Sequence, residues 1–291
     1  MNKEPRPHQT QDPFVRFIKT PKGMVMALLI LLTLIGALRP QDHFALVNAL
    51  LAVVTALILD GIVALFHHRK KLFSDGAVIT ALIVADVLSH MTPLYIIIAT
   101  TAVALMSKHL LKIGRKPIFN PAAFGLLFAI VAFGTGQSWW GSLALLPTWS
   151  IILLLVAGVY ITQRVNKFPL VLTFLGTYFI LLLAMAIMHL GLPSDTPGDA
   201  LRVPFVNSAL YLAFFMLTDP PTSPAPYRHQ VFFGAIAAGV GTVIFATSGG
   251  LAYPLIGLLT GNAWKATLHW LTKLETRRSY PETYEQGRAN Q

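Results

Sequence analysis

The stretch from His43 to Phe66 reads HFALVNALLAVVTALILDGIVALF, and Asp60 is its only acidic or basic residue apart from the leading histidine. A helix rises about 1.5 Å per residue, so about 20 apolar residues cross the roughly 30 Å hydrocarbon core of a bilayer. The stretch is therefore long and apolar enough to span a membrane as one helix.

The rest of the chain repeats this pattern. The 291 residues are 55% hydrophobic and 12% charged, whereas about a quarter of the residues in soluble domains are charged. Apolar runs predict ten spans, near residues 23–38, 43–66, 75–90, 93–107, 120–136, 148–162, 168–190, 205–218, 229–247 and 251–271. We therefore expect an all-α integral membrane protein.

The basic residues fall in alternate loops between these runs. If the N-terminus is cytoplasmic, twenty of the 22 Lys and Arg residues lie inside, and only Arg39 and Arg202 lie outside. Cytoplasmic loops carry such an excess of Lys and Arg. The pattern predicts a multi-pass protein of the inner or plasma membrane with both termini in the cytoplasm. The partners expected for its basic loops are anionic lipids rather than nucleic acid.

Ten spans divide into two halves of five. We expect cytoplasmic tails at residues 1–20 and 273–291. The two five-helix halves are expected at residues 21–141 and 142–272. Because five is odd, the second half enters the membrane in the opposite direction, which makes an inverted repeat. The third span of each half, near 75–90 and 205–218, is too short to cross alone. Sites in inverted repeats usually lie at such helices, where the halves meet.

Three polar segments are expected together at the cytoplasmic side. They are Ser74-Asp75-Gly76 before the third span, Phe119-Asn120-Pro121 before the fifth, and Thr218-Asp219-Pro220-Pro221-Thr222-Ser223-Pro224 after the eighth. Helix N-termini offer free N–H groups and partial positive charge, so a pocket here suits a carbonyl-rich or anionic group. Each segment also has a structural explanation, as a helix cap or a proline stop.

Two carboxyl groups are predicted inside the membrane. Asp60 lies in the second span and Asp86 in the third. A charge in hydrocarbon is costly unless it meets a partner or water, so each is a candidate for an ion or solute path. The alternative for each is a structural hydrogen bond or a neutral, protonated acid. Lys265, near the inner end of the last span, is expected to extend to the lipid headgroups.

The three polar segments resemble a known family. Ser74-Asp75-Gly76, Lys108-His109 with Phe119-Asn120-Pro121-Ala122, and Phe215-Met216-Leu217-Thr218-Asp219-Pro220 with Thr222-Ser223-Pro224 resemble strings of the NqrB/RnfD family. Its members are membrane subunits of sodium- or proton-coupled redox complexes. The resemblance implies a ten-helix, inverted five-plus-five fold similar to ammonium and urea channels. It also implies a non-covalent riboflavin toward the cytoplasmic side, near Asn120.

One feature of that family is missing. Its redox members attach FMN through a phosphoester to a Thr in a Ser-Gly-Ala-Thr-like string after the fifth span. Here residues 134–142 read GTGQSWWGS, and neither Thr135 nor Ser138 has that context. The expected cofactor is therefore riboflavin or FMN held without a covalent bond.

Three functions remain open at this point. The first is a membrane electron-transfer subunit with other membrane subunits or a redox partner, in which ion movement is coupled. The second is a transporter or channel-like protein for a flavin or another small solute, without a redox role. The third is a scaffold that has lost its cofactor. No residue is assigned a catalytic or metal-binding role.

Overall fold

The computed structural model describes residues 13–37, 43–68, 72–139, 149–190, 198, 201–250 and 252–279. The helices are α1 (Pro13–Ile18), α2 (Pro21–Ala37), α3 (His43–Phe66), α4 (Asp75–Val87), α5 (Leu94–Leu110), α6 (Pro121–Phe133), α7 (Trp149–Val165), α8 (Phe168–Ile187), α9 (Val203–Tyr211), α10 (Tyr227–Ser248) and α11 (Tyr253–Ser279). A π-helical segment, η3 (Leu212–Leu217), continues α9. Strands β1 (Lys112–Ile113) and β2 (Lys116–Pro117) form an antiparallel hairpin.

Each of the ten predicted spans contains a helix, and the protein is an all-α membrane protein. Among the described residues, three helices are long and apolar enough to cross a bilayer by length and composition: Phe44–Phe66, Phe168–Ile187 and Tyr227–Ser248. Shorter apolar helices are Pro21–Ala37, Leu94–Leu110, Pro121–Phe133, Trp149–Val165 and Phe205–Leu217. Two helices exceed the prediction: α1 lies in the expected N-terminal tail, and α11 continues to Ser279.

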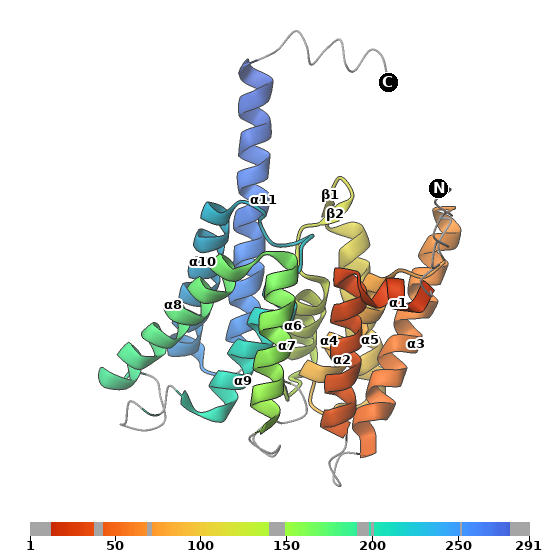
Figure 1. The fold of residues 1–291 in the computed structure, drawn as a ribbon, viewed down its shortest axis with the longest axis horizontal. Helices are drawn as coiled ribbons and strands as arrows, with labels where there is room; N and C mark the ends of the chain where they lie inside the picture. Colours follow the sequence, from red (N-terminus) through yellow and green to blue (C-terminus); the bar gives the residue numbers. More distant parts are fainter. Residues whose placement is uncertain are drawn as a thin grey trace, which may run out of the picture.

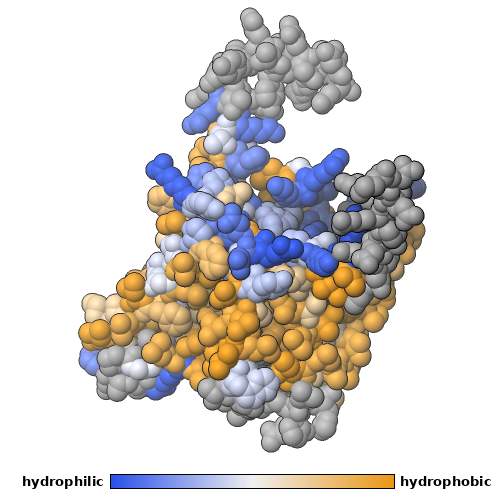
Figure 2. Space-filling view, viewed as in Figure 1, coloured by the Kyte–Doolittle hydropathy of each residue, from blue (hydrophilic) through white to orange (hydrophobic). Residues whose placement is uncertain are grey.

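The sides of the helix bundle are apolar. On the face that Figure 2 shows, hydrophobic residues cover the body of the molecule and most hydrophilic ones lie at its upper end. On α3, the side chains of Leu50, Ile58 and Leu65 are 65%, 57% and 67% exposed. Soluble monomers rarely expose such continuous apolar surfaces, so this face suits contact with lipid. The upper end carries α1, the β1–β2 hairpin and the last turns of α11 (Figure 1), and we call it the hairpin end.

Helices in equivalent places of the two halves contact each other. The first helices, α2 and α7, pack together, and so do the fifth, α6 and α11. Arg164 at the end of α7 donates a hydrogen bond of 3.0 Å to the carbonyl of Lys19, just before α2, so this pair runs antiparallel. Antiparallel contact between equivalent helices is what an inverted repeat produces. The expected boundary at residues 141 and 142 lies outside the described residues.

The third helix of each half is short, as the sequence predicts. In the first half, α4 has 13 residues and ends where the N–H of Ser138 donates to the carbonyl of Val87 at 2.8 Å. In the second half, α9 changes into the π-helical η3. Phe214 of η3 packs over Gly158 of α7, where an added Cβ would lie 2.1 Å from the ring. Short π-helical segments are frequent at functional sites.

Candidate functional site

Asn120 caps the start of α6 and also contacts the other half of the protein. Its Oδ1 accepts a hydrogen bond of 3.1 Å from the N–H of Ala123, and Pro121 follows as a first-turn proline. Both features are those that the sequence predicts for a helix start. The Nδ2 of Asn120 donates to the carbonyl of Met216 in η3 at 3.1 Å. One side chain therefore joins a helix start in the first half to η3 in the second.

Asn262 of α11 completes this junction. Its Oδ1 accepts a hydrogen bond of 2.8 Å from the N–H of Asn120, and its Nδ2 donates to the carbonyl of Thr222 at 3.1 Å. The side chain of Asn262 is fully buried. Because buried backbone groups need partners, this amide satisfies one such group on each side of the junction.

The segment that follows η3 turns back on itself. The hydroxyl of Thr222 donates to Oδ2 of Asp219 at 2.8 Å, and that of Ser223 donates to the Asp219 carbonyl at 2.8 Å. The hydroxyl of Thr218 donates to the carbonyl of Phe214 at 2.6 Å. These three hydroxyls, predicted as cofactor contacts, bond within their own segment in this structure.

Two lysines donate hydrogen bonds to this turn, one from α11 and one from the short loop before α8. The Nζ of Lys265 on α11 donates to the carbonyl of Pro221 at 2.7 Å, and the Nζ of Lys167 donates to the carbonyl of Pro224. The prediction that Lys265 extends to the headgroups is wrong, because its Nζ binds inside the protein. We call the following residues the hairpin-end cluster: Asn120, Asp219, Thr222, Asn262, Lys167 and Lys265.

Burial and charge act in opposite directions on the acid of this cluster. Burial raises the pKa of Asp219 above its ordinary value, while the hydrogen bond from Thr222 and three nearby lysines lower it. The lysines are Lys265, Lys108 and Lys22. Burial and the charge of Lys265 lower the pKa of Lys167 to about 8, against the opposing effect of Asp219. The cluster thus contains an acid and a lysine whose charges are both opposed by burial.

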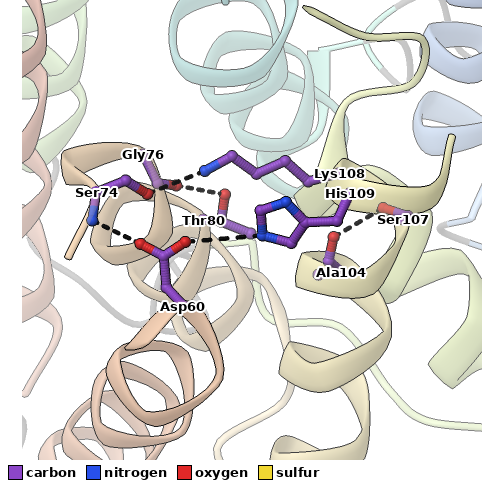
Figure 3. A network of polar contacts seen from close by, with 8 residues as sticks. All are labelled: Asp60, Ser74, Gly76, Thr80, Ala104, Ser107, Lys108 and His109. Atoms are coloured by element: carbon purple, nitrogen blue, oxygen red, sulfur yellow. Dashed lines mark hydrogen bonds and ion pairs between the residues drawn. The ribbon is translucent and has the colours of Figure 1, made fainter. Parts of the chain in front are cut away.

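The segment from Ser74 to Gly76 forms hydrogen bonds with side chains of α3 and α5 (Figure 3). The N–H of Ser74 donates to Oδ2 of Asp60 at 2.6 Å, and Nε2 of His109 lies 3.7 Å from Oδ1 of Asp60. The Nζ of Lys108 donates to the hydroxyl of Ser74 at 3.2 Å. Asp60 therefore links the start of α4 to the end of α5. Its role in an ion or solute path stays a prediction.

The three predicted segments are connected in two different ways. Asn262 joins the Asn120 segment to the Asp219 segment, because it bonds the N–H of Asn120 and the carbonyl of Thr222, and Asn120 also bonds Met216 in η3, just before that segment. Among the described residues, the Ser74 segment is connected through Lys108, because Lys108 bonds Ser74 and its charge acts on Asp219. The segments predicted to converge are therefore linked by hydrogen bonds through Asn262 for two of them, and through Lys108 for the third.

The other predicted residues lie at the edges of these segments. Asp75 is the first residue of α4 and is half-buried. A Cβ added to Gly76 would lie 3.2 Å from the Nζ of Lys108. The ring of Phe119 packs against that of Phe124, with centroids 5.9 Å apart. None of these positions conflicts with a ligand contact, and each predicted role stays a prediction.

Asp86 lies away from the hairpin end, near the last turn of α4. The hydroxyl of Thr33 on α2 is 2.8 Å from its Oδ1, and the hydroxyl of Tyr211 on α9 donates to its Oδ2 at 2.8 Å. The residue is buried, as the sequence predicts for a carboxyl group inside the membrane. Asp86 thus lies where the third helices of the two halves meet. Its place in an ion or solute path stays a prediction.

Comparison with known proteins agrees with this architecture. A model of the NQR2, RnfD, RnfE family matches residues 6–144 and 137–273, which together reach every helix of the bundle. The chain belongs to the NQR2, RnfD, RnfE family. The resemblance seen in the three polar segments is confirmed.

Relatives of this family member include RnfD proteins of an ion-translocating oxidoreductase complex. The relative from Sodalis glossinidius is 24% identical, over 72% of this chain and 79% of its own length. The relative from Yersinia enterocolitica is 30% identical, over 44% of this chain and 38% of its own length. The relative from Yersinia pestis is 29% identical, over 39% of this chain and 34% of its own length. The Yersinia matches thus cover less than half of those relatives.

Two residues of the hairpin-end cluster, Asn262 and Lys167, were not predicted from the sequence. Asn262 lies in an apolar helix, where a single polar residue gives no local indication of its partners. Lys167 lies in a short basic loop, and its charge was used only to assign topology. An amide within a predicted span was the available signal for Asn262, because polar side chains in membranes generally pair with other helices.

Proposed function

We propose that this protein is a membrane subunit of an ion-translocating electron-transport complex, located in the inner or plasma membrane with the hairpin end in the cytoplasm. Family membership and the names of the RnfD relatives support this assignment. Other membrane subunits are its proposed partners. The hairpin-end cluster is proposed to hold a flavin without a covalent bond.

The chemistry of the cluster is compatible with a flavin. The isoalloxazine ring carries carbonyl oxygens and one ring N–H, so it needs donors, an acceptor and an apolar wall. Asp219 in the cluster is an acceptor, Lys108, whose charge acts on Asp219, is a cationic donor, and the half-buried Phe119, next to Asn120, is an aromatic surface. A bound flavin would supply one- or two-electron transfer, and the protein would supply binding and orientation.

The outer segment supports the non-covalent form of this proposal. The hydroxyl of Ser138 lies 3.0 and 2.8 Å from the carbonyls of Asp86 and Leu88, so its one hydrogen is used at the end of α4. Thr135, the other hydroxyl there, lies in a string that differs from the family's attachment string. We therefore expect no phosphoester-linked FMN on either residue.

The absorption spectrum of the protein purified in mild detergent tests the cofactor. We expect flavin bands that move entirely to the supernatant after acid precipitation. Flavin fluorescence that stays with the denatured band on a gel would contradict the non-covalent proposal. Protein that is colourless after gentle purification and does not bind added riboflavin or FMN would contradict the flavin proposal as a whole.

Matched variants test the location of the flavin. Asp219→Asn keeps the shape of the side chain and removes its charge, so we expect flavin affinity to fall about tenfold or more, as for loss of one buried polar contact. Asp86→Asn is the control, because it makes the same chemical change away from the hairpin end and should leave flavin occupancy intact. The readout is flavin per mole of monodisperse protein. Equal occupancy in both variants would place the flavin elsewhere.

A transporter for flavin or another small solute is the second candidate. The missing attachment string favours it, because a solute that is released must not be bound covalently. Uptake of labelled riboflavin into vesicles that contain the purified protein distinguishes the two functions. Uptake without redox partners would support transport, and tightly bound flavin without uptake would support the electron-transfer function.

A further inference from the structure

Asp86 is a buried carboxyl group that the proposed flavin site does not use. It lies one residue before the end of α4, and its side chain contacts Thr33 on α2 and Tyr211 on α9. Within the described ranges, Tyr211 is the one titratable side chain that acts on it, and no Lys, Arg or His there forms an ion pair with it. The partners that the described part of the chain gives this carboxyl group are therefore neutral.

The hydrogen bonds around Asp86 can be counted. The hydroxyl oxygen of Thr33 lies 2.9 Å from the carbonyl of Leu29 and 2.8 Å from Oδ1 of Asp86. A hydroxyl has one hydrogen to donate, and a carbonyl can only accept. Thr residues in helices commonly give their hydrogen to the carbonyl four residues earlier. If Thr33 does so, its contact with Asp86 requires a hydrogen on Oδ1.

The other oxygen of Asp86 has the complementary role. The hydroxyl of Tyr211 donates to Oδ2 at 2.8 Å. A protonated acid offers one O–H donor and one carbonyl acceptor. Asp86 in that form would donate to Thr33 through Oδ1 and accept from Tyr211 through Oδ2, so that every group is satisfied.

We propose that Asp86 is a proton-binding site between the two halves, which holds a proton here and exchanges it with the end of the bundle opposite the hairpin end. The role of Asp86 in ion movement rests on the proposed function, and the inference adds that the ion is a proton. The ionised form is disfavoured because its charge would lie among neutral partners inside the membrane. A metal cation suits the site less well, because it needs several oxygen ligands directed at one point.

A polar segment connects Asp86 with that end of the bundle. The segment is 134–139: the hydroxyl of Ser138 lies 3.0 Å from the carbonyl of Asp86, and residues 134–138 are partly exposed. Three buried polar atoms in this segment have no hydrogen-bond partner among the described residues. They are Thr135 Oγ1, Gln137 Oε1 and Trp139 Nε1.

These atoms mark a route for water. Buried polar groups without protein partners are usually satisfied by water molecules. The ring of Trp139 also lies against that of Tyr211, with centroids 6.5 Å apart. Water at these atoms would connect the partly exposed segment with the side chain of Trp139, next to the tyrosine whose hydroxyl contacts Asp86, and we infer that the proton uses this water.

Infrared spectra of the purified protein in H2O and D2O test the proton. At neutral pH we expect the carbonyl stretch of a protonated carboxylic acid that moves to lower frequency in D2O and is absent in Asp86→Asn. The move in D2O reports exchange of the proton with solvent. If Asp86→Asn removes carboxylate bands instead, Asp86 is ionised and the proposal is wrong. A band that never moves in D2O would contradict exchange.

The folding of Asp86→Asn is a second readout. The amide of Asn can donate to Thr33 and accept from Tyr211, which reproduces the hydrogens of the neutral acid. We therefore expect its melting temperature within about 2 °C of the wild type. A variant that does not fold would contradict the proposal, since only the ionised acid needs two donors.

Tyr211→Phe tests which oxygen is the carbonyl. Loss of the donor to Oδ2 should move the acid band to higher frequency without removing it. Tyr95→Phe is the control, because Tyr95 is 64% exposed on α5 and should leave the band unchanged. An unchanged band in Tyr211→Phe would overturn the assignment of hydrogens. None of these spectra needs a flavin or a partner. A protein that binds no flavin but shows the carboxylic-acid band of Asp86 would refute the proposed flavin function and leave the proton proposal intact.

Discussion

The hairpin-end cluster and the Asp86 site differ in how each acid is stabilised. Asp219 lies among lysines of several helices, and its pKa is raised by burial and lowered by their charges. Asp86 has two hydroxyl partners and no ion pair among the described residues. Charges can be kept near the membrane surface, where water and lysines are available, whereas an acid in the membrane interior is more stable when neutral. The difference assigns ionic contacts to the hairpin end and a proton to the Asp86 site.

The largest effect is expected for Asn262→Leu in the hairpin-end cluster. It leaves the N–H of Asn120 and the carbonyl of Thr222 without their partner. Each unsatisfied buried group costs about 1–3 kcal/mol. Thermal unfolding in detergent measures the loss. The control is Thr267→Ala, an exposed residue of α11 that should change stability by less than about 0.5 kcal/mol. Equal stability of the two variants would show that Asn262 does not join the halves.

Asn120→Ala should have the next largest effect. It removes the cap of α6 and the bond to Met216, and loss of a helix cap costs about 0.5–2 kcal/mol. Asn120→Asp keeps the cap acceptor and loses only the donor to Met216, so it should be the more stable variant. If both variants unfold at the same temperature, the cap contributes nothing and the contact between halves accounts for the whole effect.

Salt should separate the two acids. Screening shortens the range of exposed charges from about 10 Å at 0.1 M salt to about 3 Å at 1 M. Higher salt weakens the attraction of the lysines for Asp219, so the wild type should lose stability relative to Asp219→Asn, by at most about 1 kcal/mol. The difference between the wild type and Asp86→Asn should not change with salt. A salt effect at Asp86 would reveal an ionic partner there.

Lys167→Met should change the free energy of unfolding least at neutral pH. Its effect should appear as the pH becomes alkaline. The pKa of Lys167 is lowered in the folded protein to about 8 from 10.5. Between these values the unfolded chain binds more protons, so the free energy of unfolding of the wild type should rise with pH relative to Lys167→Met. Chemical unfolding at several pH values measures it. A relative stability that falls over this range would show that the folded protein holds the proton of Lys167 more tightly.

Most of the fold was predictable because each membrane helix has a local signal in the sequence. A run of apolar residues must be helical in lipid, where every backbone group needs an internal partner. Asn120 before Pro121 and Asp219 before Pro220 were recognisable as a helix start and a helix stop for the same local reason. The sequence also placed Asp86 inside the membrane, with the neutral acid as one of its alternatives.

Only the tertiary structure decided which of these groups meet. Asn120 bonds Asn262, which is 142 residues away, and Lys265 bonds Pro221 instead of reaching the lipid. Asp60 binds the backbone at the start of α4, and Asp86 meets Tyr211 across 125 residues. A long apolar run determines that a segment spans the membrane, because insertion into lipid depends on the composition of that run alone. Hydrogen bonds between helices depend on rotation and depth of both partners, which no single segment of the sequence contains.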